Sequence, residues 1–295
     1  MALALVAAPA RAQATPPLPR VSAGRLERIE ALPSKHVDTR PVDVWLPPGY
    51  DGRKPHAVLY LHDGQMLFDA TTTWNRQAWE VDDVAAPLLA AGRLREFIVV
   101  AVHNNGKKRF PEYYPQKFMA HLPEAARSGL MQRGLEGAPL ADAYLRFLVE
   151  ELKPTIDRRF ATRTGRDDTV VMGSSMGGLI SVYALLEYPR VFGAAAALST
   201  HWITMFEDNE VFPAAALAYL REKLPAPGSL RLYMDHGTTE LDAQYGPAQR
   251  RIDALLKERG FVPPQVVSRV FEGTGHNERA WSERLAIPLA FLLGA

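Results

Sequence analysis

The sequence contains no cysteine, so it can form neither a disulfide framework nor a thiolate-ligated metal site. This absence fits an exported protein and a cytosolic enzyme equally well, so cysteine usage does not decide the compartment. A His-Glu-x-x-His motif is also missing, and the His-Asp pair at 62–63 alone offers too few metal ligands. We therefore expect neither a metal ion nor another cofactor.

Long apolar runs and an excess of one charge are missing as well. No run approaches the roughly 20 residues that a membrane-spanning helix needs, and the formal net charge is only +1. The basic cluster at 107–109 is short and is followed by Glu112, so we interpret it as a solvated or substrate-side loop and expect no nucleic-acid partner. In contrast, 47% of the 295 residues are hydrophobic, enough to bury a full core in one large α/β domain over 21–295.

The N-terminus has the pattern of an export signal. Residues 2–8 are apolar, and residues 9–14 end in a small-x-small pattern that predicts cleavage after Ala14. The charged region that usually precedes such a core is missing, and an Ala-rich tail is the alternative interpretation. With the proline-rich linker that follows, we assign residues 1–20 to signal peptide and linker. The protein is then periplasmic or secreted, or cytoplasmic if this interpretation is wrong.

Strand and helix patterns alternate along the rest of the chain. Two strands within 25–46 are expected to form an antiparallel sheet edge. Buried strands are predicted at 56–61, 97–102, 169–172, 194–198, 230–234 and 266–271. Helices are predicted at 80–94, at 140–160 and at 279–293, and a further helix begins directly after Ser175. The helix at 140–160 is expected to kink at Pro154. This alternation predicts a mostly parallel central sheet with helices on both faces and a ligand site at the carboxyl ends of the strands. Residues 119–137 are glycine-containing and lack a strand pattern, and we interpret them as a cap over the site.

The motif Gly-Ser-Ser-Met-Gly at 173–177 lies between a predicted strand and an apolar helix. In that context Gly-x-Ser-x-Gly predicts a nucleophilic serine on a sharp turn, where the residues two before and two after it crowd each other and must be glycine. Ser175 meets this requirement. Ser174 does not, because methionine stands at both Met172 and Met176. The alternative is an ordinary glycine-rich helix start.

A serine nucleophile needs a histidine base, and the base needs a carboxylate partner. Of the histidines that follow the motif, His276 is the best candidate, because it lies on a glycine-rich loop between the last strand and the last helix. We interpret His201 as a pocket-wall or capping residue and His236 as a loop residue near the acid.

The acid is expected on the loop after the strand at 230–234. Asp235, Glu240 and Asp242 all lie there. Asp235 is so close to the strand that it is expected to hold the loop together, and spacing alone does not separate Glu240 from Asp242.

Acyl chemistry also needs hydrogen-bond donors for the oxyanion. We expect one from the backbone N–H of Met176 and a second from that of Gln65, in the Asp-Gly-Gln turn at 63–65. A tight turn without such a role is the alternative. Residues that could line an acyl or sugar pocket are Trp74, Arg109, Tyr113, Tyr114, Trp202 and Trp281. Core packing is the competing interpretation for the aromatic ones.

The segments at 44–50, 60–68, 109–113, 173–178 and 275–278 together resemble the putative-esterase branch of the α/β-hydrolases. That group includes feruloyl, acetyl-xylan and enterobactin esterases, S-formylglutathione hydrolase and the mycolyltransferases. The resemblance runs from about Val37 to the end of the sequence. It implies an α/β-hydrolase fold, catalytic roles for Ser175 and His276, and an oxyanion N–H from Gln65. The stretch 241–245 resembles a family pattern whose aspartate is the acid, which favours Asp242 over Glu240.

The sequence therefore predicts a serine esterase that acts on a small-molecule ester, such as an aryl or sugar ester, through an acyl-enzyme on Ser175. An acyltransferase with the same three residues, a serine peptidase and a non-catalytic binding module are the alternatives.

Overall fold

The computed structural model describes residues 17–205 and 209–295. The predicted signal peptide and its cleavage site lie outside these residues. Among the described residues, no helix has both the length and the apolar character needed to cross a membrane.

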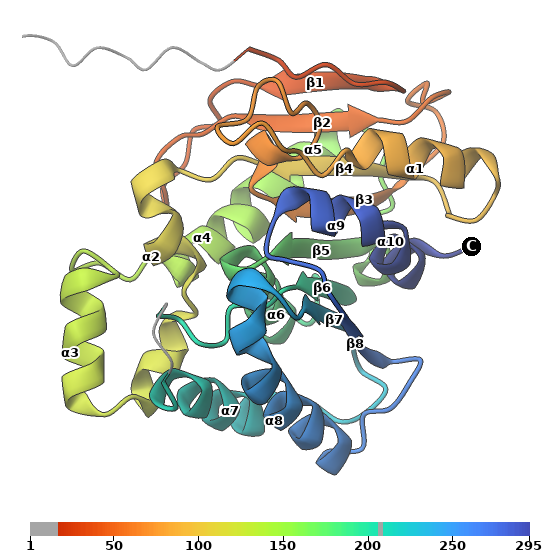
Figure 1. Ribbon diagram of the computed structural model, residues 1–295. Coiled ribbons are helices and arrows are strands. Elements are labelled where there is room, and N and C mark those ends of the chain that lie inside the picture. The colour runs from red at the N-terminus through yellow and green to blue at the C-terminus, as the bar shows by residue number, and fades with distance from the viewer. Residues whose placement is uncertain (1–16, 206–208) are drawn as a thin grey trace, which may run out of the picture.

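One eight-stranded sheet runs through the described part of the chain (Figure 1). Its strands are β1 (Arg25–Ile29), β2 (Val42–Leu46), β3 (Ala57–His62), β4 (Phe97–Val102), β5 (Thr169–Ser174), β6 (Ala194–Leu198), β7 (Arg231–Gly237) and β8 (Val266–Phe271). In space their order is β1-β2-β4-β3-β5-β6-β7-β8. β1 and β2 pair antiparallel and β2 pairs antiparallel with β4, whereas β4, β3 and β5 to β8 are all parallel. The predicted parallel sheet with an antiparallel edge is confirmed.

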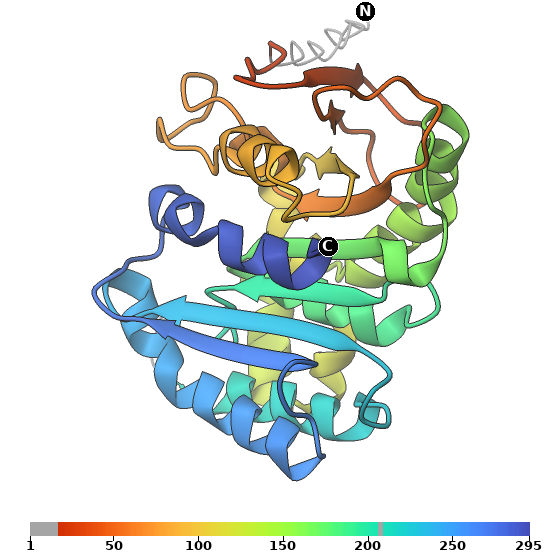
Figure 2. The same ribbon diagram turned by 90° about the vertical axis from the view of Figure 1, so that its right-hand side faces the viewer.

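Helices cover both faces of this sheet (Figure 2). They are α1 (Val81–Ala90), α2 (Arg109–Tyr113), α3 (Glu124–Arg133), α4 (Ala141–Arg146), α5 (Lys153–Arg159), α6 (Met176–Glu187), α7 (Val211–Lys223), α8 (Tyr245–Glu258), α9 (Glu278–Arg284) and α10 (Ala286–Leu293). One core includes Tyr144, Ile180 and Ile252, from α4, α6 and α8. The other includes Val81 and Leu289, from α1 and α10. The strands between these cores are apolar on both sides because both sides are covered.

Two predicted helices are interrupted, and a proline explains each interruption. The helix expected at 140–160 consists of α4, a π-helical turn Phe147–Leu152 and α5, with Pro154 at the start of α5. The helix expected at 279–293 is divided between Arg284 and Ala286, and Pro288 lies four residues after Arg284. A proline has no N–H for the carbonyl four residues earlier and clashes with it, which interrupts the regular hydrogen-bond pattern of a helix at that point.

The segment 119–137 contains the end of a 3₁₀ turn, Gln116–His121, and the whole of α3. Figure 1 shows α3 at the outer edge of the molecule, beyond α2 and α4. Its proposed role as a cap stays a prediction.

The connection between β5 and α6 is very tight. A Cβ atom added to Gly173 would lie 2.6 Å from the carbonyl carbon of Gly177. Ser175 lies between them with φ 58° and ψ −124°, an unfavourable region for a residue with a side chain. This turn places Ser175 at the carboxyl end of β5, partly exposed between buried neighbours.

We predict that Gly173→Ala lowers the free energy of unfolding by about 1–3 kcal/mol or more, because only backbone could move to admit the methyl group. Urea unfolding measures the change. The matched control is Gly165→Ala, which has φ −69° and open space around the added methyl group. This change should stay within about 0.5 kcal/mol of the unmodified protein. Equal effects of the two substitutions would contradict the steric explanation.

Candidate active site

Asp242 and His276 form the central hydrogen bond of the site. The Nδ1–H of His276 donates to Oδ1 of Asp242 over 2.6 Å. Asp242 is buried, and burial acts to raise the pKa of its carboxyl group. Hydrogen bonds from His276, Ser199 and the N–H of Gly237 outweigh burial and hold that pKa below its usual value. Asp242 is therefore an ionised acceptor that fixes the tautomer and the direction of the imidazole.

Tyr245 connects His276 with Ser175. The rings of Tyr245 and His276 pack edge to face, with centroids 5.6 Å apart, and Trp281 packs in the same way on His276 at 5.1 Å. Burial raises the pKa of the Tyr245 phenol, and a hydrogen bond with the Ser175 hydroxyl opposes this increase. No hydrogen bond joins Ser175 Oγ to His276 in the described residues, and such bonds commonly tighten only when substrate binds.

The structure distinguishes the two candidate acids by what they contact. Glu240 accepts a hydrogen bond from the backbone N–H of His276 at 2.8 Å and one from the Asn277 carboxamide at 3.3 Å. Its carboxylate thus supports the loop, whereas that of Asp242 reaches the imidazole. Asp235 forms a buried ion pair with Arg284 at 3.0 Å and connects β7 to α9. The catalytic roles of Ser175, His276 and Asp242 stay predictions at this point.

The turn that carries Gln65 is held by its polar neighbours. Asp63 has φ 57°, and its carboxylate accepts two hydrogen bonds from Arg109, at 2.7 and 2.8 Å, and one from the side chain of Asn104 at 2.7 Å. The backbone N–H of Asn104 also donates to the Gln65 side chain at 3.1 Å. Arg109 therefore uses two of its donors to hold this turn. Its contact with a substrate, and the oxyanion roles of Gln65 and Met176, stay predictions.

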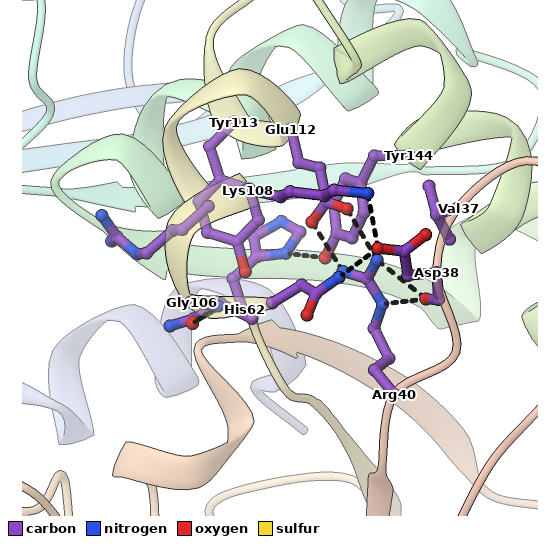
Figure 3. Close-up of polar contacts among 12 residues, drawn as sticks. Val37, Asp38, Arg40, His62, Gly106, Lys108, Glu112, Tyr113 and Tyr144 are labelled. Atoms are coloured by element: carbon purple, nitrogen blue, oxygen red, sulfur yellow. Dashed lines mark hydrogen bonds and ion pairs between the residues drawn. The ribbon is translucent and has the colours of Figure 1, made fainter. Parts of the chain in front are cut away.

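A second polar cluster lies beside this turn (Figure 3). Arg40 and Glu112 form a buried pair with two contacts of 2.7 Å, and Arg40 also donates to the backbone carbonyl of Asp38. The hydroxyl of Tyr144 lies 2.8 Å from Nδ1 of His62. These contacts fasten α2, which begins at Arg109, to the segment before β2, and the end of β3 to α4.

The structure does not gather the predicted aromatic pocket residues around one cavity. Tyr113, Tyr114 and Trp202 are buried, with Tyr113 next to Asp63 and Trp202 bonded to Gln249. Trp74 is 85% exposed, on a loop that contacts α9 through the hydrogen bond between Asn75 and Glu278. Tyr113, Tyr114 and Trp202 are therefore core residues. Contact of these three side chains or of Trp74 with a substrate stays a prediction.

The sequence reasoning gave no site role to Ser199 or Tyr245. Ser199 follows β6 directly and donates a hydrogen bond to Oδ2 of Asp242 over 2.6 Å. Its position at the carboxyl end of a buried strand was the available signal. Tyr245 ends the stretch 241–245 that suggested the acid. No group of three metal-ligating side chains occurs within residues 17–205 and 209–295.

Comparisons with known proteins identify the family and the fold of the chain. A family model described as "Putative esterase" matches residues 36–292. Protein YbbA of Bacillus subtilis is 23% identical over 274 residues, which cover 90% of this chain and 96% of that protein. An endo-1,4-beta-xylanase/feruloyl esterase of Xylanibacter ruminicola is 24% identical over 272 residues, which cover 88% of this chain and 30% of that protein. A solved ferulic acid esterase structure superposes with a TM-score of 0.66 at 20% identity, covering 92% of this chain and 99% of the other. The predicted α/β-hydrolase fold is confirmed.

Two buried histidines near the site resist protonation. Burial lowers the pKa of His62 to about 4, with the nearby Asp63 opposing and Arg109 adding to the effect. Burial likewise lowers the pKa of His201 to about 4. Nε2 of His62 is buried without a hydrogen-bond partner among the described residues. Both side chains are therefore neutral at pH 7.

We predict that the free energy of unfolding falls as the pH is lowered from about 6.5 to about 4. In this window the two histidines bind protons in the unfolded chain but not in the folded one. The resulting destabilisation is absent above about pH 6.5 and grows as the pH falls toward 4. There it lowers the free energy of unfolding by roughly 3 kcal/mol for each histidine. Urea unfolding at a series of pH values measures the slope. His62→Asn, whose carboxamide can replace Nδ1 next to Tyr144, should reduce it, and an unchanged slope would contradict this assignment.

Proposed function

The chain belongs to the "Putative esterase" family and is a carboxylic ester hydrolase, and from this premise we propose that it is a serine esterase acting through an acyl-enzyme on Ser175. The observation that carries the proposal is the hydrogen bond of 2.6 Å between the buried Asp242 and His276, whose ring packs against that of Tyr245. Ser175 in turn lies on a turn with positive φ at the start of α6. These features match what a nucleophile, its base and its orienting acid require.

In the proposed reaction, Ser175 Oγ attacks the ester carbonyl carbon while Nε2 of His276 takes the hydroxyl proton. Asp242 stabilises the resulting imidazolium. The backbone N–H groups of Met176 and Gln65 stabilise the oxyanion. Met176 is suited to this role because the first N–H groups of a helix have no acceptor within it. The C–O bond to the alcohol then breaks, and the alcohol leaves with the proton from His276. Water, deprotonated by His276, hydrolyses the acyl-enzyme and restores Ser175.

The substrate class of the proposal is an aryl or sugar ester. Its support is the similarity to an endo-1,4-beta-xylanase/feruloyl esterase and to a ferulic acid esterase. The exposed Trp74, on a loop bonded to the start of α9, adds to this support. An acyltransferase would favour an added alcohol over water, and a peptidase would cleave matched amides, so product analysis separates both from an esterase.

We also propose export, on the basis of the apolar segment at 2–8 and the small-x-small pattern before residue 15.

We expect Ser175→Ala to lower kcat for aryl esters by about 10⁶, the order of loss that removing the nucleophile causes in subtilisin. The thermal unfolding midpoint should stay close to that of the unmodified protein, because only a hydroxyl is lost. In parallel, an organophosphonate should label Ser175 and no other serine. Full activity in a folded Ser175→Ala protein, or a phosphonate adduct elsewhere, would refute the proposal.

Substitution of the two acidic residues tests the assignment of the acid. Asp242→Asn should lower kcat by about 10⁴, the loss in kcat that the same change causes in a serine protease. Glu240→Gln is the matched control. It retains an oxygen for the backbone N–H of His276 and should cost less than about 10-fold. The reverse ranking would assign the role to Glu240, and two small losses would indicate a serine–histidine dyad.

A further inference from the structure

Ser199 joins three segments that meet at the proposed acid. It follows β6, is fully buried, and contacts Asp242 on the loop after β7. Two residues of α9 also reach its Oγ atom: Nε1 of Trp281 at 2.9 Å and Nη2 of Arg284 at 3.0 Å. A single hydroxyl therefore lies between the acid and the helix that follows the His276 loop.

The direction of each hydrogen bond follows from the chemistry of the partners. An indole N–H and a guanidinium group can only donate. Trp281 and Arg284 therefore occupy both lone pairs of the Ser199 hydroxyl. Its one proton is left for Oδ2 of Asp242, at 2.6 Å. That oxygen also accepts the backbone N–H of Gly237 at 2.6 Å, so Oδ1 remains for His276.

We propose that Ser199 is a positioning residue for the reaction: with its proton directed by Trp281 and Arg284, it fixes the carboxylate of Asp242 in the rotation that presents Oδ1 to His276. This inference rests on the proposed function, because it assumes that Asp242 acts through His276 on Ser175. Ser199 is fully buried, and among the described residues its hydroxyl has hydrogen bonds with Asp242, Trp281 and Arg284 and none with Ser175. Its effect should therefore appear only through Asp242.

The backbone conformation of Ser199 allows the hydroxyl to be removed by substitution with glycine. Its φ is 43°, a region that glycine adopts more readily than serine. Ser199→Gly thus relieves backbone strain while it removes the hydrogen bonds. Arg284 keeps its bond to Asp235, and Asp242 keeps its bond from Gly237. Ser199→Ala removes the same hydroxyl without relieving the strain. Equal kinetic losses in the two variants would therefore trace the loss to the hydroxyl.

The test is a double-mutant cycle of Ser199→Gly and Asp242→Asn, measured as kcat and KM for one aryl ester. Ser199→Gly alone should lower kcat by about 10-fold to 100-fold, the loss expected when a catalytic group is slightly misplaced. KM should change less than about twofold, because the substrate contacts are untouched. In the Asp242→Asn background the same change should cost less than about twofold, since the carboxylate through which Ser199 acts is already gone.

The control is Thr200→Val, which removes the neighbouring buried hydroxyl, bonded to the carbonyl of Ala197 and not to Asp242. It should leave kcat within about twofold of the unmodified protein. Four results would each overturn the role of Ser199. Two concern Ser199→Gly alone: full activity, or a loss expressed mainly in KM. The others are different losses in Ser199→Gly and Ser199→Ala, or an equal loss with Asp242 and with Asn at position 242. Activity that survives Ser175→Ala would instead refute the proposed function, so the two failures are distinguishable.

Discussion

The close contact between the backbones of Gly173 and Gly177 determines where Ser175 stands. Because no side chain fits between them, β5 can turn directly into α6 and leave Ser175 with positive φ at the carboxyl end of the sheet. The N–H of Ser175 donates to the carbonyl of Leu198 at the end of β6, which fixes the turn against its neighbouring strand. The proposed roles of Asp63, Asp242 and His276 all depend on this position of Ser175.

Charged pairs connect the segments around this point. Asp63 pairs with the partly exposed Arg109, and two further pairs, Arg40 with Glu112 and Asp235 with Arg284, are buried. A buried ion pair gains little net stability, because desolvation of the two charges offsets their attraction. Its geometry is nevertheless strict, since a half-satisfied charge in the interior is costly. We therefore interpret the three pairs as devices that fix loop positions around the site, and the hydrogen bonds of Ser199 as the same principle applied to the acid.

The strands and the turn that carries Ser175 were predictable from the sequence because they depend on local pattern. The apolar runs gave β4, β6 and β8 with their observed bounds, and the glycine spacing singled out Ser175. The contacts of the acidic side chains were not predictable. Glu240 and Asp242 are two residues apart on one 3₁₀ turn, and only the tertiary structure sends one to the backbone of His276 and the other to its ring. The same holds for Tyr113 and Tyr114: the sequence suggested a loop, whereas Tyr113 ends α2 and both side chains are buried in the core.

The central claim is that ester hydrolysis proceeds through a covalent intermediate on Ser175. The most direct measurement is rapid acid quenching of the protein during turnover of an activated aryl ester, followed by mass spectrometry of its peptides. The account predicts one acyl group per chain on the peptide that contains residues 173–177, attached to Ser175, and its disappearance when the ester is exhausted. Steady turnover with no acylated peptide, or an acyl group on a different side chain, would contradict it.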